Sequence, residues 1–145
     1  MKLTQEDDYA LRVVLFLYRY GQDRRIEAKM IAEHENVPLR FLLKLLRKLA
    51  VAGVVKSYMG YGGGYAVEKP PERVNLLEVI EAIEGPLAVT KCLEDVSGCN
   101  LGRAGSCEIH RALGGVQQRL AEDLRTITFQ NLLKEFPPCA PDAQV

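Results

Sequence analysis

Long apolar runs are absent from this sequence of 145 residues, although hydrophobic residues make up 48% of it. The apolar stretches are short and interrupted by charged residues, so no segment is predicted to cross a membrane. The opening stretch, MKLTQEDDYALR, is acidic, whereas a secretory signal would be basic and then apolar. We therefore expect a cytoplasmic location, where cysteine thiols stay reduced.

A net charge is also absent, because 19 basic residues balance 19 acidic ones. The balance is not local, since positions 37–67 contain no acidic residue. The basic residues in that stretch are Arg40, Lys44, Arg47, Lys48 and Lys56. A basic patch on an acidic body is typical of a DNA-binding element. Charge alone leaves a solvated helix face equally open.

Signatures of an enzyme are missing as well. No nucleophile has a base partner at a recognisable spacing along the chain. The glycine-rich stretch GYGGGY follows a predicted strand but opens no helix, which distinguishes it from a dinucleotide-binding loop. We predict that the protein is not an enzyme.

The first half of the chain is predicted to form three helices and a hairpin. The predicted elements are helices over 4–20, 26–34 and 38–50 and strands over 54–58 and 65–67. Thr4 suits an N-cap with Asp7 three residues later, and Pro38 suits the first turn of the third helix. The apolar positions of that helix are Phe41, Leu42, Leu45, Leu46 and Leu49. Glycines between the strands predict a flexible tip.

This order of elements is that of a winged helix-turn-helix, in which the third helix lies in the DNA major groove. Arg40, Lys44 and Arg47 share one face of that helix, opposite its leucines, and can reach phosphates or guanine edges. The predicted DNA-binding residues are Arg40, Lys44, Arg47, Lys48, Lys56, Ser57, Gly60, Tyr61 and Gly62. Leu43 lies among the basic residues, where it suits a thymine methyl group and a protein contact equally.

The second half of the chain is predicted to be helical around a cysteine-containing loop. Asn75 and Glu78 resemble a capping box for a helix that ends before Gly85. A long helix over 108–133 carries an apolar stripe of Leu113, Val116, Leu120, Leu124 and Ile127. Such a helix needs a partner surface, and a second copy of the chain is the simplest one.

The fold we predict is mainly α-helical with a small β-hairpin wing and a long C-terminal dimerisation helix. The predicted regions are a DNA-binding domain over 1–70, a dimerisation region over 71–133 with a cysteine loop over 88–107, and a disordered tail over 134–145. Cys139 lies in that tail and is predicted to be a bystander.

Three of the four cysteines, Cys92, Cys99 and Cys107, lie close together. An odd number of thiols in a reducing compartment argues against disulfides. The C-x2–4-C pair of a zinc knuckle is absent. A glycine-rich loop with three thiols suits a polynuclear cluster, whose negative charge Arg103 can offset. Three free thiols that sense oxidants directly are the alternative.

The chain resembles the family of bacterial winged-helix regulators that includes IscR, a regulator of iron–sulfur assembly, and NsrR, a nitric-oxide sensor. The matching motifs are MKLTQEDDYAL at the start, GYGGGY in the wing, NLLEVIEAIEG before the cysteines and RTITFQNLL at the end of the dimer helix. The resemblance implies a homodimer on palindromic promoter DNA and a [2Fe–2S] or [4Fe–4S] cluster held by the three cysteines. In the wing, Met59 replaces the usual arginine of the family.

The resemblance also implies two candidates for the fourth ligand. His110 follows Cys107 by three residues, as in the IscR arrangement. Asp8 matches the aspartate that reaches the cluster of the other subunit in NsrR. We give a slight preference to Asp8, because the acidic start QEDDY places a carboxylate at the matching position and the cysteine loop is longer than usual.

The function predicted from these features is a transcriptional regulator, expected to act as a repressor, whose promoter affinity depends on an iron–sulfur cluster. Two alternatives remain open at this stage. One is a cysteine-thiol redox sensor or regulator without a cluster. The other is an iron–sulfur carrier with no role on DNA, although a carrier has no use for the aligned cations Arg40, Lys44 and Arg47.

Overall fold

The structure is a computed structural model, and it describes residues 2–136. Its helices are α1 (Gln5–Tyr20), α2 (Ala28–Glu35), α3 (Leu39–Val51), α4 (Leu76–Glu84), α5 (Lys91–Glu94), α6 (Glu108–Thr126) and α7 (Phe129–Glu135). Its strands are β1 (Val55–Tyr58) and β2 (Gly64–Val67), and short 3₁₀ turns span Pro71–Arg73 and Val96–Gly98. No helix within residues 2–136 is both long and apolar enough to cross a membrane.

Helix α1 begins with the predicted cap. The Asp7 amide donates to Thr4 Oγ1 at 3.2 Å, and the Thr4 amide donates to the Asp7 carboxylate at 2.9 Å. This reciprocal pair satisfies two N–H groups that a helix start otherwise leaves without partners. Helix α1 then buries Val13, Phe16 and Leu17 in the core. The first predicted helix is therefore confirmed.

Helix α3 places its leucines in the core, as the periodicity predicts. Leu42, Leu45, Leu46 and Leu49 have no exposed surface. Phe41 was expected on the same apolar face, but 42% of it is exposed, because it lies on the edge of the helix against the ring of Tyr9. Pro38 is the N-cap of α3 and so precedes its first turn.

The hairpin is antiparallel, with Val55 opposite Val67 and Tyr58 opposite Gly64. A third segment joins it, because the Ile26 and Tyr65 backbones exchange N–H···O bonds of 2.9 and 2.8 Å. Gly64 permits this approach: its φ is 144°, and a Cβ there would lie 2.7 Å from the Ile26 carbonyl oxygen. The loop before α2 is thereby fixed to strand β2 of the hairpin.

The predicted single helix over 108–133 is wrong, because the chain breaks at Ile127 and Thr128. Thr128 starts α7 with its own capping box to Asn131. The backbone on both sides of the break pairs with the segment that leads into α4. The Phe129 amide donates to the Val74 carbonyl and the Leu76 amide donates to the Ile127 carbonyl, both at 3.0 Å. These tertiary bonds replace the helical bonds that a continuous helix would have made.

Helices α4 and α7 belong to the same hydrophobic core as α1 and α3. Val79 and Ile83 of α4 and Phe129 of α7 are buried with the leucines of α3. The Asn75 side chain caps α4 by accepting from the Glu78 amide at 2.9 Å, while the Glu78 carboxylate pairs with Lys69. The predicted boundary at residue 70 therefore separates segments that share one core.

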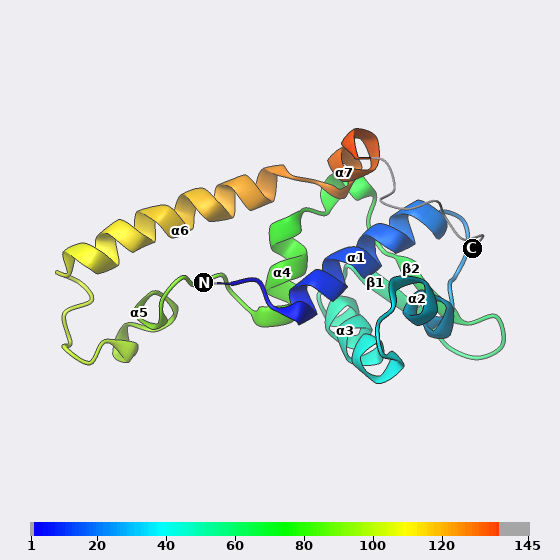
Figure 1. The fold of residues 1–145 in the computed structure, drawn as a ribbon, viewed down its shortest axis with the longest axis horizontal. Helices are drawn as coiled ribbons and strands as arrows, with labels where there is room; N and C mark the ends of the chain where they lie inside the picture. Colours follow the sequence, from blue (N-terminus) through cyan, green and yellow to red (C-terminus); the bar gives the residue numbers. More distant parts are fainter. Residues whose placement is uncertain (1, 137–145) are drawn as a thin grey trace.

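Figure 1 shows α6 extending away from this core, with α5 and the cysteine loop at one end of the long axis and the hairpin tip at the other. No residue of α6 is buried within the chain. Residues 134 and 135, expected in the disordered tail, belong to α7. The predictions for Cys139 and for the tail from residue 137 onward lie outside the described residues.

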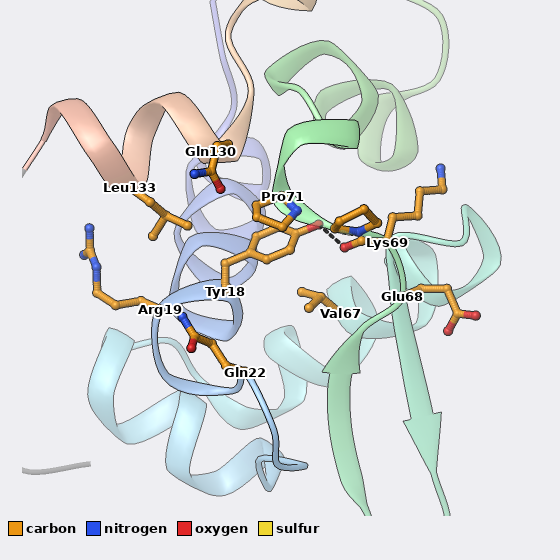
Figure 2. A pocket seen from close by; sticks show the side chains of 10 residues that line it. Tyr18, Arg19, Gln22, Val67, Glu68, Lys69, Pro71, Gln130 and Leu133 are labelled. Atoms are coloured by element: carbon orange, nitrogen blue, oxygen red, sulfur yellow. Dashed lines mark hydrogen bonds between the residues drawn. The ribbon is translucent and has the colours of Figure 1, made fainter.

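A cavity of about 660 Å³ lies where α1, the segment after β2 and α7 meet. Figure 2 shows Tyr18 at its centre, with its hydroxyl donating to the Lys69 carbonyl at 2.8 Å. Burial raises the pKa of the Tyr18 hydroxyl, which therefore stays a donor. This bond fixes the end of the hairpin to α1.

Candidate DNA-binding surface and cysteine loop

The outer face of α3 carries the cations that the sequence predicted. Arg40, Lys44 and Arg47 are all exposed, and they lie opposite the buried leucines. Leu43 is 41% exposed beside them. Within the described residues neither Arg40 nor Arg47 forms an ion pair. Their positive charge is therefore available to phosphates.

Two lysines of α3 are engaged by α1 instead. Lys44 Nζ lies 2.8 Å from one Glu6 carboxylate oxygen, and Lys48 Nζ lies 3.0 Å from the other. Lys48 also donates to the Ile83 carbonyl of α4 at 3.0 Å. The bonds from Lys44 and then Lys48 lower the pKa of Glu6. Lys48 thus joins three helices, and the charge of Lys44 is partly balanced.

The hairpin tip is exposed and glycine-rich. Lys56 and Ser57 are exposed on β1, and Met59 and Tyr61 at the tip are almost wholly solvent-accessible. Gly60 and Gly62 have φ values of 82° and 74°, in the left-handed region that side chains disfavour. The predicted hairpin residues thus lie on β1 and on the adjoining tip, and Met59 supplies no charge to that tip.

Sequence reasoning missed one cation beside the hairpin. Arg25, in a stretch without regular structure, places its guanidinium 3.8 Å from the ring centroid of Tyr58. Arg25 lies outside the basic patch predicted over 37–67, where no acidic residue occurs. The pairing of Ile26 with Tyr65, which brings Arg25 to the hairpin, has no signal in local sequence.

The cysteine loop is built from α5, a 3₁₀ turn and the start of α6. Cys92 lies on α5, Cys99 directly follows the turn, and Cys107 is the N-cap of α6. All three are free thiols of intermediate burial. The predicted thiols are thus on one loop, each held by a different local element.

His110 lies between two of these thiols. Its Nδ1 is 3.4 Å from Cys92 Sγ, and its amide donates to Cys107 Sγ at 3.5 Å. Thr90 Oγ1 also lies 3.3 Å from Cys92 Sγ. The predicted ligands Cys92, Cys107 and His110 are therefore neighbours.

Cys99 is not among the thiols that His110 contacts by hydrogen bond in residues 2–136. Backbone N–H groups of the loop, foremost those of Arg103 and Leu101, stabilise its thiolate and lower its pKa. Within residues 2–136 no three side chains of histidine, cysteine, aspartate or glutamate converge closely enough to hold a metal ion. The loop as it stands brings two of the three predicted cysteines to the histidine.

Asp8 lies on the exposed side of α1. Its carboxylate pairs with Arg12 at 3.1 Å, and Arg12 also pairs with Glu35 at 3.1 Å. A contact between Asp8 and the cysteines of a second subunit is a property of a dimer, and it stays a prediction.

The proposed dimer stripe is only partly covered within the chain. Leu113, Leu120 and Leu124 are of intermediate burial, whereas Val116 and Ile127 are 45% and 37% exposed. A helix of 19 residues that buries none of its side chains has an unpartnered apolar side. The stripe therefore stays a candidate interface.

Comparison with known proteins identifies this architecture. The family described as Rrf2, iron-dependent transcriptional regulator, matches residues 3–135. The chain belongs to the Rrf2 family. A putative HTH-type transcriptional regulator of Neisseria meningitidis is 30% identical over 135 residues, which cover 93% of this chain and 89% of the relative. The regulator IscR of Vibrio campbellii is 30% identical over 135 residues, with coverages of 93% and 79%.

A solved structure supports the same assignment. CymR, the global cysteine regulator of B. subtilis, superposes with a TM-score of 0.72 at 25% identity, over 94% of this chain and 99% of that one. The winged-helix fold predicted from the order of helices and hairpin is confirmed. This Rrf2-family chain is a DNA-binding transcriptional regulator, and the relatives named above are transcriptional regulators rather than enzymes.

Proposed function

We propose that this Rrf2-family protein acts as a homodimer on palindromic promoter DNA, with its affinity controlled by an iron–sulfur cluster. Cys92, Cys99 and Cys107 would hold the cluster, together with His110 or the partner subunit's Asp8. The observation that carries the proposal is the contact of His110 with Cys92 Sγ at 3.4 Å. An imidazole and a reduced thiol in contact are two groups that commonly bind the same transition-metal ion.

The chemistry of the donor set fits such a cluster. Thiolates are the ordinary ligands of iron–sulfur clusters, and imidazole is an accepted substitute. The loop N–H groups that stabilise the Cys99 thiolate are of the kind that tunes cluster sulfurs. A bound cluster would supply a group that responds to oxidants, nitric oxide or iron supply. Because no three histidine, cysteine, aspartate or glutamate side chains converge in residues 2–136, binding requires the segment between Cys92 and Cys107 to rearrange.

That rearrangement would reach the DNA-binding surface through α6. Cys107 caps α6, and the far end of α6 leads into α7, whose Phe129 is buried in the core with α1. The cysteine loop and the hairpin tip lie at opposite ends of the chain (Figure 1), so a cluster would not touch the hairpin of its own chain. The coupling would therefore be allosteric, with two dimer arrangements of different recognition-helix spacing.

A thiol sensor without a cluster is the second candidate function. It is favoured by the lowered pKa of Cys99, since the thiolate is the form that oxidants attack. The likeness to a cysteine regulator, CymR, points in the same direction. An iron–sulfur carrier with no role on DNA is set aside, because the relatives are transcriptional regulators.

The deciding experiment is anaerobic purification followed by an absorption spectrum and by counts of iron and sulfide per chain. The cluster proposal expects visible charge-transfer bands that are lost in Cys92→Ser, Cys99→Ser and Cys107→Ser. Cys139→Ser is the matched control and should keep the bands. A colourless protein that takes up no iron or sulfide on anaerobic reconstitution, and yet changes DNA affinity on thiol oxidation, would establish the thiol sensor instead.

A further inference from the structure

Two cations lie close to one aromatic ring at the end of the wing next to its tip. The Arg25 guanidinium lies 3.8 Å from the centroid of the Tyr58 ring, and Lys56 Nζ lies 5.5 Å from the same centroid. Arg25 comes from the stretch before α2. Lys56 and Tyr58 are two positions apart on β1, so their side chains lie on the same face of that strand. The three side chains therefore form one cluster, called here the Arg25–Tyr58–Lys56 cluster, across two segments of the chain.

The backbone is arranged so that this cluster can form. Tyr58 is paired with Gly64, and Gly64 lies directly against Ile26. Because Gly64 has no side chain, the backbone of Ile26, the residue after Arg25, can lie directly against β2. The two Ile26–Tyr65 hydrogen bonds hold the residue after Arg25 in place. The position of Arg25 beside the wing is thus built into the fold.

The cluster carries two positive charges, and the acidic residue Asp23 lines the groove beside it. In residues 2–136 neither Arg25 nor Lys56 forms an ion pair with a carboxylate. Both residues are exposed. Stacking on Tyr58 restricts the guanidinium while leaving its N–H edge free to donate. Two like charges on one ring repel each other, and an anion between them relieves that repulsion.

We propose that the Arg25–Tyr58–Lys56 cluster binds the DNA backbone beside the wing, with Arg25 as a phosphate contact supplied by the α1–α2 loop. This inference rests on the DNA-binding function of the chain and adds to it a residue outside the helix-turn-helix and the hairpin. A groove of about 400 Å³ beside the ring, lined by residues of the loop and both strands, continues the surface from Tyr58 toward Gly62 of the tip. Met59 brings no charge to that tip, and Arg25 supplies a positive charge beside the tip instead.

The test measures affinity and its salt dependence on a duplex that the wild-type protein selects from a random 30-base-pair pool. The variants are Arg25→Gln and Lys56→Gln, and Lys134→Gln is the control that removes the same charge. Lys134 is exposed on α7, which Figure 1 shows on the side of the molecule away from α3 and the hairpin tip. Circular dichroism and light scattering establish that each variant is folded and has the wild-type oligomeric state.

We expect Arg25→Gln to weaken binding about tenfold, as the loss of one charge-assisted hydrogen bond does. The slope of log affinity against log salt should become shallower by about 0.9. Lys134→Gln should change neither quantity. Equal losses in Arg25→Gln and Lys134→Gln would reduce the effect to net charge and overturn the contact, as would wild-type affinity and slope in Arg25→Gln.

The same experiment separates this inference from the function on which it depends. If wild-type protein selects no duplex from the pool, DNA binding itself fails. If wild-type protein binds and Lys56→Gln is weakened while Arg25→Gln is not, the hairpin contact stands and the role of Arg25 is refuted.

Discussion

His110 Nδ1 lies 3.4 Å from Cys92 Sγ, although the two residues are 18 positions apart in the chain. The contact joins the start of α6 to α5 and closes the cysteine loop within a single subunit. Asp8, the other candidate ligand, is paired with Arg12 on α1. We therefore prefer His110 to Asp8, which the sequence slightly favoured, because His110 already contacts a cysteine whereas Asp8 must leave Arg12.

The first prediction concerns these two ligands. His110→Ala should shift the absorption bands of the anaerobically reconstituted protein and shorten the lifetime of the cluster in air, because a ligand is lost. Asp8→Ala should keep the wild-type spectrum if His110 is the ligand. The opposite pattern, with bands altered by Asp8→Ala and kept by His110→Ala, would assign the site to the partner subunit's Asp8.

The second prediction concerns the recognition helix. Arg40→Gln and Arg47→Gln should each weaken promoter binding and lower the log–log salt slope by about 0.9, as expected for one lost phosphate contact. Lys48→Gln should change the slope less, because Lys48 is already bound to Glu6 and to the Ile83 carbonyl. Fluorescence anisotropy with labelled duplex at several salt concentrations measures all three. A larger slope change in Lys48→Gln than in Arg40→Gln would reverse this order.

The third prediction concerns Glu6 and acid. Its pKa is lowered by hydrogen bonds from Lys44 and then Lys48, so the folded state binds this proton less readily than the unfolded chain does. The resulting stabilisation is complete above the ordinary value of 4.5 and is lost as the pH falls through the lowered pKa. Glu6→Gln should therefore lower the free energy of unfolding at neutral pH by about 1 kcal/mol or less, as exposed pairs do.

Urea unfolding followed by circular dichroism at neutral and acid pH tests this sign. The difference between wild type and Glu6→Gln should shrink toward zero as the pH falls through the lowered pKa of Glu6. Glu33→Gln, on an exposed residue of α2, is the control and should have no effect at either pH. A difference that grows in acid would contradict the assignment.

The fourth prediction concerns assembly. Leu120→Asp should give monomers or insoluble protein, because it places an unpaired charge in the proposed interface of α6. Gln118→Asp is the matched control, since Gln118 is exposed and lies on the opposite side of the same helix. Light scattering of both variants decides the matter. A soluble dimer of Leu120→Asp would show that α6 does not pair through this stripe.

The fifth prediction concerns α7. Phe129 is fully buried against Tyr18, with ring centroids 5.5 Å apart. Phe129→Ala should lower the free energy of unfolding by about 3–5 kcal/mol, the usual cost of replacing a buried phenylalanine with alanine. Phe136→Ala removes a ring that is 58% exposed and should cost little. Equal stability of the two variants in urea unfolding would mean that α7 is not part of the core.

The sequence determined those features that depend on neighbours in the chain. The capping box of Thr4 and Asp7, the buried leucines of α3 and the glycine-rich tip follow from spacing and from backbone preferences, and the structure has them where the sequence placed them. The resemblance to winged-helix regulators added the family, which the comparisons confirm.

Tertiary structure decided the features that depend on distant segments. The stripe over 108–133 is periodic enough for one helix, but backbone bonds to Val74 and Leu76 end it at residue 126 and send α7 into the core. The pairing of Lys44 with Glu6 and the placement of Arg25 over Tyr58 arise in the same way. Local sequence reports which residues can form a helix or carry a charge. Only packing decides which charge is balanced by a neighbour and which is left for DNA, because that depends on segments that meet only in the folded chain.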